Sequence, residues 1–152
     1  MSESIYSKLV PEPTPDSMPY WKSLNEGKLR LQECARCKKL RHYPRPVCDA
    51  CYSFETNWVE ASGKGAIHSW TITHHSFHEG YESDLPYTLV TVDLEEGVRI
   101  LARLHAPMAT ELDIGMPVRL VFEKAMPCLT LPGCALADSS SDVSASSSLR
   151  AR

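Results

Sequence analysis

Four cysteines form the sequence pattern with the clearest chemistry. Two residues separate Cys34 from Cys37, two separate Cys48 from Cys51, and ten residues lie between the pairs. Each pair can place two thiolates on one side of a tight turn. Two such turns that face each other give the tetrahedral sulfur shell that Zn²⁺ accepts. The spacing therefore predicts one Zn²⁺ bound by these four cysteines in a zinc ribbon at residues 28–54.

The predicted metal has a structural rather than a catalytic role. Four sulfur ligands leave no open coordination position for water or substrate, whereas catalytic zinc sites keep one. Iron is the alternative metal, because tetrahedral sulfur cages accept both. A disulfide framework is disfavoured because the N-terminus lacks the basic start and apolar stretch of a secretory signal. A redox dithiol would need only one Cys-x-x-Cys pair.

Charge is distributed unevenly along the chain. The net charge is −3, yet residues 28–51 contain seven basic and two acidic residues. Basic groups beside the cysteines would favour their thiolate form. In the rest of the chain acidic residues outnumber basic ones. This argues against a nucleic-acid-binding barrel, since such a domain should be positively charged. The seven basic residues are Lys28, Arg30, Arg36, Lys38, Lys39, Arg41 and Arg45.

The other reactive side chains form no recognisable catalytic pattern. His74, His75 and His78 are expected to be polar loop residues, with contact to substrate as the alternative. Cys128 and Cys134 lie in an apolar segment and are expected to be small buried residues. The sequence holds no Gly-rich phosphate loop and no nucleophile elbow. We therefore do not expect this chain to be an enzyme by itself.

Length and hydropathy indicate a cytoplasmic globular protein without a membrane partner. The 152 residues and the 43% hydrophobic fraction suffice for a folded core. The apolar run at 98–104 is short and contains two arginines, whereas a membrane helix needs about 20 apolar residues.

The elements that must position the cysteines are mostly strands. A short helix is expected from Asp16 to Gly27, because Asp16 or Ser17 can cap it and Pro19 suits its first turn. Residues 1–15 read as an extended arm, and residues 138–152 as a disordered Ser-rich tail. Turn signals between short strands predict a small barrel or sandwich. The expected strands are 56–61, 65–75, 86–94, 98–106, 117–124 and 128–131.

The order of these features resembles a known family, the acyl-CoA-associated proteins with an N-terminal helix, a rubredoxin-like zinc ribbon and a C-terminal OB-fold. The resemblance covers about residues 16–133 and departs at Lys38, where the family often has glycine. Besides the cysteines, it rests on Tyr20-Trp21, Leu24, Gly27, Leu29, Tyr43-Pro44-Arg45, Trp58, Ser62-Gly63-Lys64-Gly65, Trp70-Thr71 and Ile100-Leu101-Ala102-Arg103.

This resemblance implies a mainly β fold with a function inside an enzyme complex. It divides the chain into an arm and helix (1–27), a zinc ribbon (28–54), an OB-fold barrel (55–137) and a disordered tail (138–152). Such proteins are usually non-catalytic small subunits of thiolase-like acyl-CoA enzymes, whose larger subunit supplies the nucleophilic cysteine and the acid/base histidines. The small subunit supports assembly and shapes the acyl-CoA site at the shared interface, in some systems for aromatic or other unusual acyl-CoAs. The alternatives are a stand-alone acyl-CoA-binding module and a nucleic-acid-binding zinc-ribbon/OB-fold protein.

A partner interface is expected on the helix and the ribbon. Tyr20, Trp21 and Leu24 give the short helix an apolar face, and aromatic residues often anchor interfaces. The alternative is that Trp21 docks on the chain's own barrel. Basic residues beside this face would meet acidic partner surface or CoA phosphates, and they are Arg36, Lys38, Lys39, Arg41 and Arg45.

Overall fold

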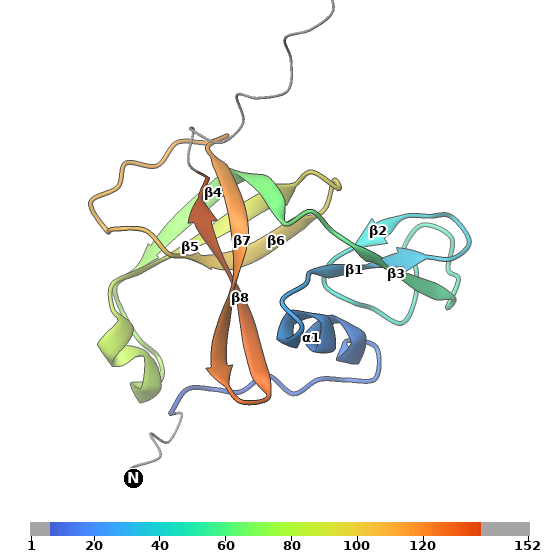
Figure 1. Ribbon diagram of the computed structural model, residues 1–152, viewed down its shortest axis with the longest axis horizontal. Helices are drawn as coiled ribbons and strands as arrows, with labels where there is room; N and C mark the ends of the chain where they lie inside the picture. Colours follow the sequence, from blue (N-terminus) through green and yellow to red (C-terminus); the bar gives the residue numbers. More distant parts are fainter. Residues whose placement is uncertain (1–6, 138–152) are drawn as a thin grey trace, which may run out of the picture.

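A small ribbon sheet lies beside a β-barrel, and one short helix packs below their junction (Figure 1). The structure, a computed structural model, describes residues 7–137, so the expected tail at 138–152 lies outside the described residues. The elements are α1 (Met18–Asn25), β1 (Arg30–Cys34), β2 (Leu40–Arg41), β3 (Thr56–Glu60), β4 (Lys64–Thr73), the 3-10 helix η1 (Glu79–Asp84), β5 (Tyr87–Leu94), β6 (Arg99–Leu104), β7 (Pro117–Met126) and β8 (Leu129–Leu136).

The ribbon sheet is antiparallel with the strand order β2-β1-β3. β3 pairs with β1 along its whole length, from Arg30 opposite Glu60 to Cys34 opposite Thr56. The expected domain division puts residues 56–60 in the barrel region, beyond residue 54. Its pairing instead extends the ribbon sheet, because β1 has only the two-residue β2 on its other side.

The second sheet is a closed barrel with the order β4-β5-β6-β8-β7. β6 and β8 pair in parallel, and the other neighbours are antiparallel. This is the five-stranded OB-fold arrangement, and the predicted mainly β architecture is confirmed. Glu95-Glu96-Gly97 form the turn between β5 and β6, in the gap between the expected strands 86–94 and 98–106, and Gly97 takes the left-handed φ of +79° there.

The last strand, β8, is longer than the expected strand at 128–131. β8 continues through Pro132 and Gly133 to Leu136, whereas the expected strand ended at residue 131. Pro132 and Gly133 normally weaken a strand, which hid this continuation. A Cβ atom at Gly133 would lie 2.5 Å from Nε2 of His105, so a larger residue there would require the His105 ring to move.

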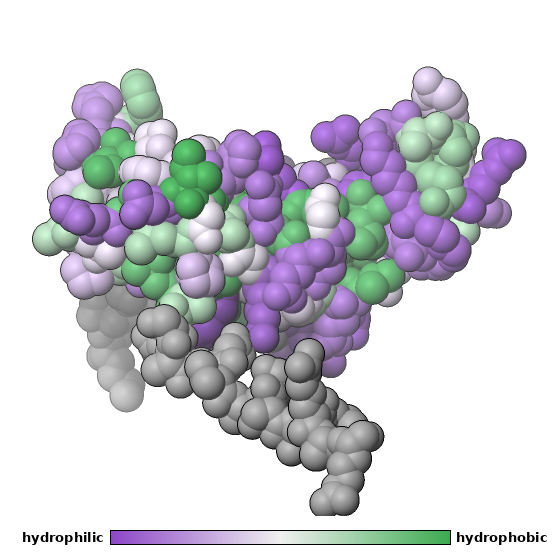
Figure 2. Space-filling view, turned by 90° about the horizontal axis from the view of Figure 1, so that it is seen from above, coloured by the Kyte–Doolittle hydropathy of each residue, from purple (hydrophilic) through white to green (hydrophobic). Residues whose placement is uncertain are grey.

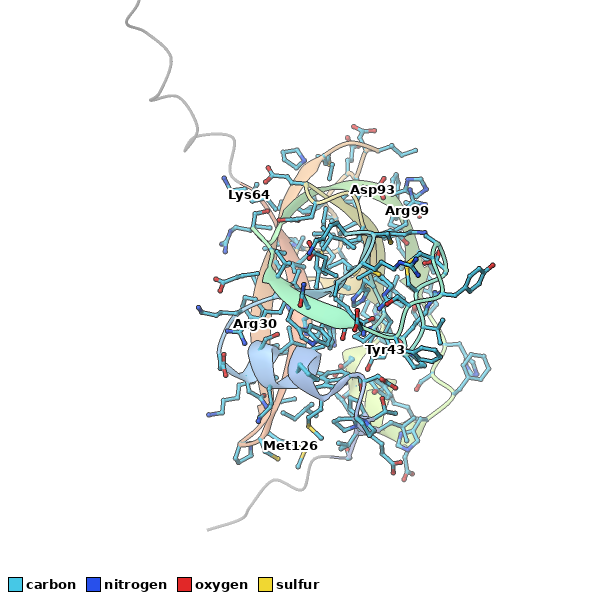
Figure 3. All side chains as sticks on the ribbon, turned by 90° about the vertical axis from the view of Figure 1, so that its right-hand side faces the viewer. Arg30, Tyr43, Lys64, Asp93, Arg99 and Met126 are labelled. Carbon is cyan, nitrogen blue, oxygen red and sulfur yellow. The ribbon has the colours of Figure 1, made fainter. Side chains whose placement is uncertain are left out.

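Helix α1 is covered by the protein itself. Tyr20 is 3% exposed and Leu24 is fully buried, so the expectation that they face a partner is wrong. Trp21 is half-buried, and its Nε1 donates a hydrogen bond of 2.8 Å to the hydroxyl of Tyr43 on the ribbon. Figure 3 shows Tyr43 beside the helix. The expected Ser17 cap is also absent, since the Ser17 hydroxyl accepts from the amide of Thr14 instead.

Residues 7–15, the described part of the expected arm, contact the barrel side of the molecule before the chain enters the helix, and residues 1–6 lie outside the described residues. Lys8 Nζ lies 2.6 Å from a carboxylate oxygen of Asp84, and Arg103 of β6 lies 2.5 Å from the same oxygen. Asp84 is largely buried, and its desolvation is outweighed by hydrogen bonds to the two cations, so its pKa is lowered. The arm, the η1 loop and the barrel are therefore joined at one carboxylate. Within residues 7–137 no helix is long and apolar enough to cross a membrane.

A buried histidine at the contact between helix and ribbon predicts a stability change with pH. His42 packs against Tyr20 with ring centroids 5.3 Å apart, and burial lowers its pKa to about 4. The unfolded chain therefore binds a proton at higher pH than the native chain does. The contribution of neutral His42 to the free energy of unfolding is fully present above about pH 6.5. Up to about 3 kcal/mol of it is lost as the pH approaches 4.

Chemical unfolding between about pH 7 and pH 4.5 measures this effect. The His42→Phe variant keeps an aromatic ring but has no titrating group. Its free energy of unfolding should fall less than that of the parent over this range, while thiolate protonation affects both proteins alike. Equal pH dependence in the two proteins would contradict the prediction.

Candidate metal centre

The two Cys-x-x-Cys turns have the same backbone structure. In the first turn, the amide of Lys38 donates to the carbonyl of Cys34, at 2.9 Å, and the amide of Cys34 donates to Lys39. In the second turn, Tyr52 donates to Cys48, also at 2.9 Å, and Cys48 donates to Ser53. β1 ends at Cys34 and so delivers the first turn to the site.

The four sulfur atoms converge as the spacing predicted. Their Sγ atoms all lie within 4.8 Å of one another, with 3.5 Å between Cys34 and Cys51 and 3.6 Å between Cys37 and Cys48. Zn–S bonds of about 2.3 Å in a tetrahedron place sulfurs about 3.8 Å apart. The four cysteines therefore fit one tetrahedral Zn²⁺, and the site is closed to substrate.

Backbone amides prepare two of the sulfurs for metal binding. The amide of Cys37 donates to Cys34 Sγ and, against desolvation, lowers the pKa of that thiol to about 6. The amides of Ala50 and Cys51 likewise lower the pKa of Cys48. For Cys37 the amide of Lys39 lowers the pKa, but burial and the neighbouring sulfurs outweigh it and raise the value to about 11. A bound Zn²⁺ would favour all four thiolates.

Ion pairs on the ribbon neutralise part of its positive charge. Lys39 of the first turn lies 2.6 Å from Asp49 of the second and so links the two turns. Lys38 lies 3.4 Å from Glu33 on β1. Among residues 7–137 neither Arg36 nor Arg45 makes an ion pair. The ribbon therefore presents two unpaired guanidinium groups at its surface.

The structure does not gather the other candidate residues into a site. His75 stacks edge-on against Phe77, at 4.9 Å between centroids, while His78 Nδ1 accepts from the amide of Gly80. Both interactions are local to the loop between β4 and β5. In the part of the chain that the structure describes, His74, His75 and His78 form no metal-binding cluster. The expectation of polar loop residues agrees with these contacts.

The two remaining cysteines have different environments. Cys134 is fully buried, and this burial raises its pKa to about 12, so its thiol stays protonated. Cys128 is exposed in the turn between β7 and β8, contrary to the expectation that it is buried. In residues 7–137 no cysteine side chain forms a hydrogen bond with a histidine. Neither thiol is therefore arranged as an activated nucleophile.

A closed four-cysteine ribbon joined to an OB-fold barrel defines the class of zinc-ribbon/OB-fold proteins. The family model for the rubredoxin-like zinc ribbon domain of ChsH2 matches residues 21–57, and that for the C-terminal OB-fold domain of ChsH2 matches residues 58–123. The chain belongs to this ChsH2 and DUF35 family.

Relatives of this chain include both large subunits and small proteins. A probable enoyl-CoA hydratase alpha subunit of Thermomonospora curvata is 39% identical over 117 residues, which are 77% of this chain and 36% of that protein. A DUF35 domain-containing scaffold protein of Pyrococcus furiosus is 36% identical over 107 residues, which are 69% of this chain and 76% of the relative. The chain thus spans about a third of the hydratase subunits that it matches.

A solved structure with the same architecture is that of an Ltp2-ChsH2(DUF35) aldolase. The similarity has a TM-score of 0.76 at 37% sequence identity, and it covers 84% of this chain and 98% of that one. The similarity therefore includes the ribbon, the helix and the barrel together.

Removal of one ligand should release the metal. The Cys34→Ser variant should lose stoichiometric Zn²⁺ and loosen residues 28–54 while the barrel persists, because a segment this short has too little core of its own. Elemental analysis gives the metal content, and hydrogen exchange gives the local stability. Cys128→Ser is the matched control, since Cys128 lies outside the cluster and should leave the metal in place. A folded, unoxidised parent protein without metal would contradict the assignment.

Proposed function

We propose that this chain is a non-catalytic small subunit of a thiolase-like acyl-CoA enzyme complex. One observation carries the proposal: in residues 7–137 the cysteines either fill a closed metal site or lack a histidine beside them. A thiolase-type reaction needs a thiolate next to an acid/base group. A partner subunit must then supply that group.

Relatives support a role within a complex. The similar ChsH2(DUF35) chain was solved as part of an aldolase with Ltp2, and the curated relatives are named hydratase alpha subunits or scaffold proteins. In this proposal the zinc keeps the ribbon folded for assembly, and the barrel helps to shape an acyl-CoA site at the shared interface. Aromatic or other unusual acyl-CoAs are the proposed substrates of the complex, and the cytoplasm is its proposed location.

Purification with native partners tests the proposal. The tagged chain should co-purify with an enzyme subunit that mass spectrometry identifies as thiolase-like, and that subunit should need this chain for full acyl-CoA turnover. Tight binding of an acyl-CoA to the isolated chain, with no partner recovered, would instead support a stand-alone binding module. Recovery of RNA alone would support nucleic-acid binding.

The free cysteines should be dispensable for chemistry. The isolated chain should show no thiolytic activity, and the reconstituted complex should keep its activity within about twofold when Cys128→Ala or Cys134→Ala is introduced. Cys134→Ala should lower thermal stability because it leaves a cavity in the core. Steady-state assays on the complex measure the effect. A loss of turnover in either variant with the complex intact would show a catalytic cysteine in this chain.

A further inference from the structure

Strand β4 continues beyond the point where its second neighbour in the barrel ends. Only residues 64–66 pair with β7, and Ile67 then exchanges hydrogen bonds with Gly115 and Met116 of the loop before β7. Residues 69–73 pair with β5 alone. In the part of the chain that the structure describes, no strand lies along their other side. The closed barrel therefore carries a free strand edge, which we call the β4 edge.

The direction of the backbone identifies the groups that the β4 edge leaves unpaired. In an antiparallel sheet, alternate residues of a strand bond to the neighbours on its two sides. The amide of Leu94 donates to Val98, so the even-numbered residues of β5 direct their backbone groups toward β6. Trp70 and Ile72 lie opposite two of these residues and so direct their own N–H and C=O groups away from β5. None of these groups has a hydrogen-bond partner among residues 7–137.

The side chains of the same two residues are only partly covered. Trp70 is 38% exposed and Ile72 is 42% exposed, and residues 68–72 are all exposed. A strand with one covered face would instead alternate buried and exposed residues. Met108, also exposed, extends this apolar surface, because its Sδ lies 3.9 Å from the hydroxyl of Thr88, the register partner of Ile72. On the barrel lobe, at the left, Figure 2 shows strongly hydrophobic residues exposed among hydrophilic ones.

The β4 edge lacks the features by which proteins usually protect exposed strands. Such edges carry lysine, proline or inward-pointing charges, or they are covered by another segment. Residues 69–73 are Ser-Trp-Thr-Ile-Thr and contain neither a charged residue nor a proline. The irregularity of β4, a register shift between Ile67 and Ser69, precedes this stretch. An unprotected edge of aromatic and β-branched residues is a template for a further strand.

The sequence of the β4 edge is complementary to itself. When a second copy lies antiparallel across a two-fold axis at Thr71, Trp70 of each copy faces Ile72 of the other. Each such pair exchanges two backbone hydrogen bonds, which satisfies the free N–H and C=O groups of both copies. The pair also sets an aromatic ring beside a β-branched side chain, a favourable cross-strand combination. On the other face Thr71 meets its own symmetry mate and Ser69 meets Thr73, so hydroxyl groups lie together.

We propose that two copies of this chain associate through their β4 edges, as an antiparallel strand pair across a two-fold axis at Thr71. Two-fold dimers of this kind use the same surface patch of both chains. The pair joins β5 and β4 of one copy to β4 and β5 of the other in one continuous sheet. A strand of another protein would have to supply matching apolar and hydroxyl faces, which the second copy already has. The inference goes beyond the proposed function and does not depend on it, since it needs no enzyme subunit.

Self-association of the zinc-loaded full chain tests the proposal. Sedimentation over about a hundredfold range of concentration should show a monomer that becomes a dimer, because mass action favours the pair at high concentration. Thr71→Lys should abolish the dimer, since two like charges then meet at the two-fold axis. Thr71 is exposed, so the melting temperature should change little. Leu101→Lys is the matched control, because Leu101 is 61% exposed on β6, outside the edge, and the same added charge should leave the dimer in place.

Amide hydrogen exchange tests the register of the pair. The amides of Trp70 and Ile72 should become protected as the concentration of the parent rises, and they should exchange rapidly at every concentration in Thr71→Lys. The amide of Thr71 is directed at β5 and should be protected in both proteins.

Three results would overturn the proposal. They are a parent that stays monomeric at every concentration, a dimer that Thr71→Lys leaves intact, and a dimer in which the amides of Trp70 and Ile72 stay unprotected. Protection of these two amides only after the enzyme subunit is added would assign the β4 edge to that subunit and would also overturn self-pairing. The proposed function is tested separately, by recovery of the enzyme subunit, and stands or fails independently of these results.

Discussion

Four sulfur atoms from two separate turns must meet within 4.8 Å, and the rest of the N-terminal half is built to satisfy this distance. The ribbon cannot rely on a large core, since its strands are five, two and five residues long. Metal–sulfur bonds to both turns stabilise the ribbon, in place of the large apolar core that stabilises bigger domains. Because β1 ends at Cys34 and also contacts α1, the position of the helix depends on the same centre. The aromatic contacts of Tyr20 with His42 and Tyr43 then complete the junction.

Local patterns explain which features the sequence could predict. The cysteine spacing, the turn at 95–97 and the short helix each depend on residues that are close in the chain, so their signals survive without tertiary context. The barrel strands alternate buried and exposed residues, as in β5, where Thr88, Val90, Val92 and Leu94 face inward. The expectation of an OB-fold barrel rests on the family resemblance, because alternation alone does not choose between a barrel and a sandwich.

The features that the sequence could not predict depend on long-range pairing or burial. β3 has the composition of any short strand, and only its register with β1 assigns it to the ribbon. Pro132 and Gly133 are typical of a strand end, yet β8 continues because both residues pair with β7 and Gly133 also pairs with β6. In the sequence, Tyr20 and Leu24 form an apolar helix face with no visible partner. In the structure, the ribbon and β8 cover this face. The left-handed backbone of Tyr52 has no sequence signal, because the residue type there disfavours it.

The chain contacts the barrel side of the molecule both before and after it forms the ribbon. Lys8 is bound to Asp84 at the barrel, α1 and the ribbon follow, and the chain returns through residues 61–63 to β4. That return is itself anchored, since Ala61 donates to Leu29 and the carbonyl of Gly63 accepts from Leu120. The ribbon is thus a loop with both ends fastened to one body rather than a lobe on a single hinge. A protease that cut at residues 61–63 would produce a nicked molecule whose halves stay together, and the two lobes would tumble as one.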